Sequence, residues 1–533
     1  MSMGNKTFSS GKIVFLLLAF YALLQAYCIP QLSLNYDEPL FAAYGITVLK
    51  FQGKKDIQTF DSKLPITALN MLPRAAEQLT NPALSKSGME ADQDIFNGRY
   101  ISLIISLLLG LLIFRWTSEL YNDKVGIYSL LLYLLCPDFL AHGIFVSSDI
   151  FACLFFTSSF YFLWKFRQSS HLKYFILASC SVAFAQISKF SMLHLVLIFP
   201  LIQFFTCKKE NPKRITITKE LFLFLIFAII NWLVISSAHF FYNEFMPLKN
   251  YDFKSEPFQK LQAFLGDFPV PLPESYVSSM DAVIYFDRLG GGVPGSLNGA
   301  TYILGEQSRF GFWYYYIVSI FYKLPIPTLF VWIASLGVFL IQFDRKTFLN
   351  KNIFFLVPIL YFLFYLSFFY NTQVGIRHII FIFPLLFVNS GWIINLILEK
   401  KKKVVLFLLL AWQLISVALF FPHFLPYTNE FIPNKKYAYK KLADSNICYG
   451  EGKKYLKQFL EANKTAVYLP DRPQGGKVVM EINEMLNMNI ATINKYNWAR
   501  NLKPSGHIHS QYLIFDINPA MADSLQKLYP QDD

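Results

Sequence analysis

The chain has 533 residues, of which 54% are hydrophobic, 18% aromatic and only 16% charged. This composition is more apolar than that of ordinary globular proteins and predicts a membrane protein. The formal net charge of +13 does not indicate a nucleic-acid partner, because the basic residues fall mainly in short clusters between apolar runs, such as residues 208–214 and 399–403.

About eleven apolar runs are candidates to cross a bilayer, since a spanning helix needs roughly 20 mostly apolar residues. They lie near residues 12–30, 99–117, 125–143, 149–166, 172–188, 190–206, 218–240, 315–342, 352–370, 378–397 and 404–422. The first run has a short basic leader but no convincing small-residue cleavage site, so we expect it to remain as an anchor. The six cysteines form no C-x-x-C pair and predict neither a disulfide framework nor a zinc cage.

The distribution of basic residues predicts which segments lie on each side of the membrane. With the N-terminus inside, the cytoplasmic connections are all net basic or nearly so. Three larger segments then lie outside: residues 31–98, residues 241–314 and a tail from residue 423. The tail has ordinary polarity with helix-like and strand-like patterns. We therefore predict an α-helical polytopic membrane domain (1–422) followed by a small soluble α/β domain (423–533).

Several cations lie on the side where the positive-inside rule predicts few. They are Arg99, Lys189, Lys323, Arg377 and His378, all at the outer ends of predicted spans. Any one of them can be explained as a side chain that snorkels to the membrane interface. Together, however, they favour an anionic headgroup held at the bilayer boundary, such as the phosphate of a lipid carrier.

Three acidic residues lie on the same outer face. Asp37 and Glu38 precede an apolar stretch with helical spacing, and Asp149 opens the span at 149–166. Each can be explained by helix capping or by a favourable interaction with the helix dipole. Alternatively, a carboxylate beside a lipid-linked sugar would accept the proton of an attacking hydroxyl, while the cations stabilise the phosphate that leaves.

The sequence resembles the polyprenol-dependent glycosyltransferases of the GT-C fold, and is most similar to the protein O-mannosyltransferase and aminoarabinose transferase group (glycosyltransferase families 39 and 83). The segments that carry the resemblance are NYDEPLFAAYG (35–45), KLPI (63–66), GRYISLIISLLLG (98–110), LLYLLCPDFLAHGIFVSSDIF (131–151), ISKFSML (187–193), NGATYILGEQSRFGFWYYYIVSIFYKLPIP (298–327), GIRHIIFIFP (375–384) and LADSNICYGEGKKYLKQFL (442–460). They cover most of the chain in order, so the resemblance is more specific than any single motif.

The resemblance implies a role for each candidate residue. Asp37 corresponds to the acidic residue of the first outer loop, which acts as catalytic base or positions the acceptor, with Glu38 beside it and Asp149 as a second acid. The residues implied to face the donor phosphate are Lys63, Arg99, Lys189, Lys323, Arg377 and His378. Some relatives hold a divalent ion near the acids, which makes a metal at Asp37 and Asp149 an open alternative.

The departures from the family pattern concern one loop and the tail. Leu64 replaces the first proline of a Pro-Pro-Leu motif, and the tail has Cys448 and Tyr449 where relatives often have Asp-Trp, so the role of the tail is open. The large β-trefoil insertion of eukaryotic protein mannosyltransferases is absent from residues 241–314. The resemblance therefore favours a bacterial enzyme in the inner membrane with a periplasmic active site. The glycine-rich run at 288–295 is expected to be a mobile loop over that site.

The predicted function is therefore transfer of a sugar, with inversion, from a polyprenyl-phosphate donor to a protein, lipid or glycan acceptor. A transporter or flippase for lipid-linked sugars would explain the outer cations, but it predicts ionisable residues deep within spans and repeat symmetry, and the sequence shows neither. A noncatalytic subunit with the same fold is the second alternative. The acids and cations retained together argue against it.

Overall fold

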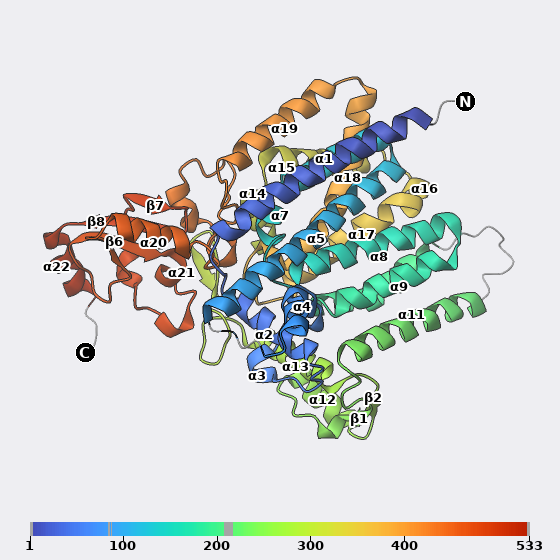
Figure 1. The fold of residues 1–533 in the computed structure, drawn as a ribbon, viewed down its shortest axis with the longest axis horizontal. Coiled ribbons are helices and arrows are strands. Elements are labelled where there is room, and N and C mark those ends of the chain that lie inside the picture. The colour runs from blue at the N-terminus through green and yellow to red at the C-terminus, as the bar shows by residue number, and fades with distance from the viewer. Residues whose placement is uncertain (1–3, 84–85, 87, 207–216, 530–533) are drawn as a thin grey trace.

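The computed structural model describes residues 4–83, 86, 88–206 and 217–529. Long helices lie side by side in a bundle, and the C-terminal region packs against one end of it (Figure 1). The helices are α1 (Gly4–Cys28), α2 (Glu38–Leu49), α3 (Ile57–Phe60), α4 (Leu72–Thr80), α5 (Gly88–Leu120), α6 (Asp123–Leu134), α7 (Pro137–His142), α8 (Asp149–Ser169), α9 (Leu172–Gln186), α10 (Leu195–Phe205), α11 (Ile217–Ala238), α12 (Glu256–Leu265), α13 (Glu274–Leu289), α14 (Tyr315–Lys323), α15 (Ile326–Ile341), α16 (Arg345–Thr347), α17 (Ile353–Phe368), α18 (Phe383–Glu399), α19 (Lys403–Ala418), α20 (Lys453–Ala462), α21 (Ile482–Met485) and α22 (Pro519–Leu528). The strands are β1 (Met246–Pro247), β2 (Pro269–Val270), β3 (Thr301–Ile303), β4 (Glu306–Ser308), β5 (Val467–Tyr468), β6 (Gly476–Glu481), β7 (Gly506–Ile508) and β8 (Tyr512–Ile517).

The predicted fold class, a polytopic helical membrane protein with a small α/β region, is confirmed. All eleven predicted runs contain helix. By length and composition, five helical segments among the described residues can cross a membrane: Ser10–Gln31, Gly88–Leu120, Lys219–Ala238, Arg345–Phe368 and Ile380–Glu399. The other predicted runs hold shorter or interrupted helices, or, in α8, a helix that carries charged residues.

Prolines explain two of the interruptions. The run at 125–143 is divided between α6 and α7, and Pro137 begins the second piece. The run at 315–342 is divided between α14 and α15, with Pro325 and Pro327 at the junction. Proline lacks a backbone N–H and restricts the residue before it, so it begins a helix more readily than it continues one. Lys323 thus lies at the end of a helix, not inside a continuous span.

The polar segments gather at one end of the bundle. The first of them contains α2, α3 and α4, and the second contains α12 and α13 with two short antiparallel strand pairs, β1–β2 and β3–β4. Figure 1 shows α2, α3, α12 and α13 at the end of the bundle away from the N-terminus. Segments far apart in the sequence therefore meet beyond the same ends of the membrane helices.

The C-terminal region is built on a four-stranded sheet in the order β5-β6-β8-β7. Strands β5 and β6 are parallel, and the other neighbours are antiparallel. Its connection to the bundle is made by main-chain hydrogen bonds: the amide of Ser33 donates to Glu451 O (2.8 Å) and that of Tyr36 to Tyr449 O (3.0 Å). The stretch that leads to Asp37 is therefore attached directly to the C-terminal region.

Candidate active site

Asp37 is the residue before α2, but its carboxylate does not cap this helix. The capping is done by Asn35, whose Oδ1 accepts hydrogen bonds from the amides of Asp37 (3.0 Å) and Glu38 (2.9 Å). An amide side chain in this position satisfies donors that a helix start leaves unpaired. The capping explanation for Asp37 is thereby excluded, and its carboxylate is free to make other contacts.

The carboxylate of Asp37 lies beside Arg377 and Tyr449. Its Oδ2 accepts hydrogen bonds from Arg377 Nη1 (2.9 Å) and from the hydroxyl of Tyr449. Arg377 Nη1 also donates to the Tyr449 oxygen (2.6 Å), and its guanidinium lies 4.6 Å from the centre of the Tyr449 ring. Residues from the segment between α1 and α2, the loop before α18 and the C-terminal region therefore meet at one carboxylate.

This environment favours the ionised form of Asp37. Burial raises the pKa of the carboxyl. The charges of Arg377 and Lys63 and the hydrogen bonds from Tyr449 and Arg377 lower it by more than burial raises it, so the pKa of Asp37 falls to about 2. Asp37 is therefore anionic at any ordinary pH. In the form described, it is ready to orient a hydroxyl group but is a weak acceptor of its proton.

Asp149 forms a second ion pair in the same region. As the first residue of α8 it lies beyond the N-cap, Ser148, whose side chain makes no capping bond. Its Oδ1 accepts a hydrogen bond from Lys189 Nζ (2.7 Å), and Lys189 Nζ also donates to the main-chain oxygen of Arg377 (3.3 Å). The pair is thereby connected to the cluster around Asp37.

Lys63 forms no ion pair among the residues that the structure describes. Its ammonium lies 4.7 Å from the centre of the Phe41 ring, and no carboxylate in the described ranges is within 4 Å of it. Lys63, Lys189 and Arg377 all interact electrostatically with His378. The four basic residues therefore lie in one region of the structure, near Asp37.

Lys55 was not predicted from the sequence, and it holds the segment that presents Lys63. Its buried ammonium donates to Asp61 O (2.9 Å), Lys63 O (2.6 Å) and the hydroxyl of Ser279 on α13 (2.7 Å). Burial lowers the pKa of Lys55 to about 7, despite the opposing charge of Asp61. Nothing in the sequence distinguished this lysine from its exposed neighbour Lys54.

Glu38 and Arg99 form a buried ion pair with one another. Arg99 donates to Glu38 from Nε (2.8 Å) and Nη2 (2.6 Å), and both side chains are fully buried. The remaining N–H groups of Arg99 reach the carbonyls of Ile29, Leu32 and Ser33. The two groups satisfy one another and connect α5 to the start of α2. This arrangement does not favour the predicted roles, a catalytic Glu38 and a phosphate-binding Arg99, which stay predictions.

The contacts of Lys323 likewise do not favour its predicted role in binding the donor phosphate, which stays a prediction. Its ammonium is buried and donates to Leu425 O (2.5 Å) and Asn446 O (2.9 Å), with Asp138 Oδ1 at 3.6 Å. A buried ammonium with three oxygen neighbours has little capacity left for a phosphate. Lys323 thus connects α14 to the chain that leads into the C-terminal region.

The donor set does not fit the divalent metal considered at Asp37 and Asp149. Each carboxylate is held by a cation, Arg377 or Lys189, which would repel a metal ion. Within residues 4–83, 86, 88–206 and 217–529, no group of three or more His, Cys, Asp or Glu side chains is arranged to hold a metal. We therefore derive no step that depends on a metal.

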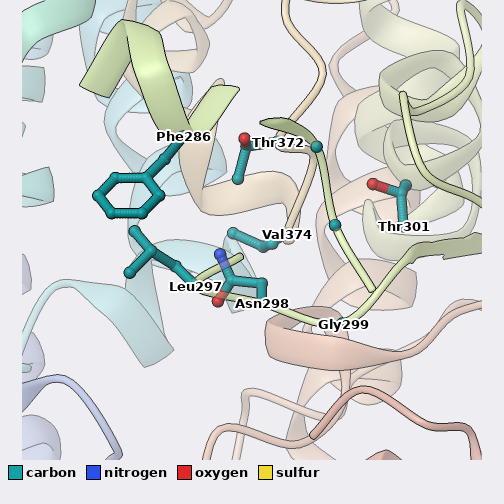
Figure 2. A pocket seen from close by; sticks show the side chains of 9 residues that line it. Phe286, Leu297, Asn298, Gly299, Thr301, Thr372 and Val374 are labelled. Atoms are coloured by element: carbon teal, nitrogen blue, oxygen red, sulfur yellow. The ribbon is translucent and has the colours of Figure 1, made fainter. Parts of the chain in front are cut away.

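The glycine-rich run lies beside the loop that leads to Arg377. Figure 2 shows Phe286, Leu297 and Asn298 near Thr372 and Val374, around a small pocket. The volume of this pocket is about 20 Å³. Such a volume holds about one water molecule, so this pocket does not accommodate a sugar. Gly290 adopts a φ of +74°, and a Cβ there would lie 2.5 Å from Arg309 O, so a glycine is required at this turn.

A larger cavity of about 290 Å³ between α9, α10 and α11 is lined mainly by apolar side chains and contains none of the predicted site residues.

One segment of the chain is similar to a known protein family. Residues 89–236 match the family model described as dolichyl-phosphate-mannose-protein mannosyltransferase. This segment contains Asp149 and Lys189 but not Asp37, Lys63 or Arg377. No curated protein matches the sequence.

One solved structure is similar over most of the chain, that of the Archaeoglobus fulgidus oligosaccharyltransferase in its apo form. The alignment covers 86% of this chain and 60% of the other, with 12% sequence identity and a TM-score of 0.46. This chain therefore spans well under two thirds of the length of that protein.

Proposed function

We propose that this protein is a glycosyltransferase of the GT-C type: it transfers a sugar from a polyprenyl-phosphate donor to an acceptor hydroxyl at the periplasmic face of a bacterial inner membrane. The observation that carries the proposal is the carboxylate of Asp37 beside Arg377 and the unpaired Lys63. A carboxylate for the acceptor next to cations for a phosphate is what glycosyl transfer from a lipid phosphate requires.

In the proposed reaction the acceptor oxygen attacks the anomeric carbon from the side opposite the phosphate. A new carbon–oxygen bond forms to the acceptor, and the bond between the anomeric carbon and the phosphate oxygen breaks. The phosphate leaves with the electron pair, and the acceptor proton passes to Asp37. One displacement of this kind inverts the configuration of the sugar.

The unused donors of Arg377 support a role in binding the phosphate. Nη1 is engaged by Asp37 and Tyr449, whereas Nε is buried and has no hydrogen-bond partner among the described residues. A guanidinium edge of this kind suits a phosphate, because two parallel N–H groups match two of its oxygens. Arg377 would then contact the acceptor carboxylate and the donor phosphate together.

Donor binding would also change the basicity of Asp37. Arg377 and Lys63 keep the pKa of this carboxyl low in the described state. A bound phosphate adds negative charge beside both cations and opposes their field, so the pKa of Asp37 rises. The carboxylate becomes a better proton acceptor only when the donor is in place, which limits transfer to the complete complex.

The test is transfer of a labelled sugar by the purified protein in proteoliposomes, with polyprenyl-phosphate sugars as donors and a set of hydroxyl-bearing peptides, lipids and glycans as acceptors. We expect labelled product with at least one pair, and a product of inverted configuration by NMR. If no pair yields product while labelled donor moves between leaflets, the protein is a lipid-linked sugar flippase and the proposal is wrong.

Lys63→Met is expected to weaken donor binding with little change in fold. The ammonium has no salt bridge in the described ranges, so its loss leaves no buried carboxylate unpaired. Because a charged hydrogen bond contributes about 1.5–3 kcal/mol, the KM for donor is expected to rise by roughly 10- to 100-fold. Lys54→Met, an exposed lysine nearby, is the control and should leave the KM unchanged. An unaltered KM in Lys63→Met would remove Lys63 from the donor site.

A further inference from the structure

We propose that Tyr449 is a positioning residue, supplied by the C-terminal region, that holds one oxygen of Asp37 so that the other faces the acceptor. This inference rests on the proposed function and assigns a task to a part of the chain whose role the sequence left open. Asp37 and Tyr449 are separated by more than 400 residues, so only the fold brings them together.

The two carboxylate oxygens of Asp37 have different surroundings. Arg377 and Tyr449 both donate to Oδ2, and among the described residues no hydrogen bond reaches Oδ1. The carboxylate is partly exposed, with 25% of its side-chain surface accessible. Oδ1 is therefore the oxygen available to an acceptor hydroxyl, and its direction is set by the two bonds at Oδ2.

Tyr449 is itself held in place by several contacts. Its amide donates to Glu451 Oε2 (3.0 Å), and its carbonyl accepts from the amide of Tyr36 (3.0 Å), next to Asp37. Its ring lies edge-on to that of Phe145 at 6.3 Å. Glu451 is itself fully buried against His423, with Nε2 to Oε1 at 2.6 Å. The phenol is thus fixed from several directions, as a group that orients another side chain must be.

The same short segment of the C-terminal region, residues 445–451, also contacts the chain next to Arg377. Asn446 Oδ1 accepts from the amide of Ile376 (2.9 Å), and the hydroxyl of Ser445 donates to Val374 O. Residues 445–451 therefore contact the chain next to both partners of the Asp37–Arg377 pair. A displacement of this segment would move the carboxylate and the guanidinium together.

Gly450 shows how close this contact is. It has a φ of +92°, and a Cβ on it would lie 3.1 Å from the ring of Tyr36. The hydroxyl of Tyr36 in turn donates to Glu481 at the end of β6 (2.5 Å). A backbone that only glycine adopts readily, packed against the residue before Asp37, fits a segment that has to approach the loop closely.

The experiment is Tyr449→Phe in the full-length protein, measured as kcat and donor KM in the transfer assay. This variant keeps the ring and its contact with the Arg377 guanidinium. It removes the hydroxyl, and with it the hydrogen bond donated to Asp37 and the one accepted from Arg377 Nη1. We expect kcat to fall by roughly 10- to 100-fold, corresponding to one hydrogen bond to a charged group, with the donor KM within about twofold of wild type. Tyr455→Phe is the matched control, because the Tyr455 hydroxyl has no hydrogen-bond partner in the described part of the chain.

A second readout distinguishes positioning from a purely structural role. The hydroxyl of Tyr449 lowers the pKa of Asp37, so its removal should move the acid limb of the kcat profile to higher pH. The charged groups that also act on Asp37 are Arg377, Lys63 and Asp444, whose pKa burial raises to about 6. They are unchanged in both tyrosine variants, so only Tyr449→Phe should show the shift.

The outcomes separate the two proposals. Active wild-type protein with an unchanged kcat and acid limb in Tyr449→Phe would overturn the positioning role and leave the glycosyltransferase function standing. A fall in thermal stability without a change in kcat below the unfolding temperature would also overturn it. No transfer by the wild type with any donor would reject the proposed function, and the positioning role with it.

Discussion

Asp37→Asn is expected to lower the rate of sugar transfer by about 10²- to 10⁴-fold, the usual contribution of a general base. Asparagine keeps the size of the side chain and can still accept from Arg377, but it carries no charge and cannot take the acceptor proton. Since Arg377 and Lys63 remain, the donor should still bind. The measurement is kcat in the transfer assay, with donor affinity determined separately by equilibrium binding.

The control for this variant is Asp92→Asn, at an exposed position near the start of α5, which should behave as wild type. Asp37→Asn also removes the negative charge that pairs with Arg377, which leaves the guanidinium charge available to the donor phosphate. Donor binding is therefore expected to be unchanged or tighter. Normal turnover in Asp37→Asn would reject Asp37 as the base. In that case Asp149, held by Lys189, is the next carboxylate to test.

The sequence was sufficient for the general architecture, and the reason is physical. Apolar runs and the asymmetry of basic residues report directly on the bilayer, which acts on each segment separately. Hydropathy alone predicts one span at 125–143 and one at 315–342. The prolines in these runs are the local signal that α6–α7 and α14–α15 are broken helices. The α/β character of the tail also followed from local pattern, whereas its contacts with the outer loops did not.

The candidate site was predicted less completely, because the sequence gives the position of a charge relative to the membrane but not its partner. Lys63, Arg99 and Lys323 all look alike as cations near the outer boundary. In the structure, Lys63 has no ion pair within the described ranges, whereas Arg99 and Lys323 are buried against oxygens. Tyr449 carried no charge to attract notice, and its approach to Asp37 depends on how the C-terminal region packs.

The Glu38–Arg99 pair leads to the prediction with the largest expected effect on stability. Arg99→Met leaves Glu38 fully buried without its cation, in contact with only the amides of Asn35 (2.9 Å) and Val146 (3.0 Å). Breaking a buried ion pair from one side typically costs about 3–5 kcal/mol, because the remaining charge stays desolvated. We therefore expect a marked fall in the thermal unfolding temperature in detergent and a poorly expressed protein.

Two further variants show whether this effect comes from the unpaired charge. Arg115→Met lies on the same helix α5, where Arg115 pairs with Glu119 at the surface and is 65% exposed, so its loss should cost no more than about 1 kcal/mol. The double variant Glu38→Leu, Arg99→Met removes both charges and should be more stable than Arg99→Met alone, since no buried charge is left without a partner.

If Arg99→Met were instead as stable as wild type but bound the donor weakly, Arg99 would return to the donor phosphate site. Because Glu38 directly follows Asp37, loss of the pair should also lower kcat at temperatures where the protein is still folded, through displacement of the carboxylate that faces the acceptor.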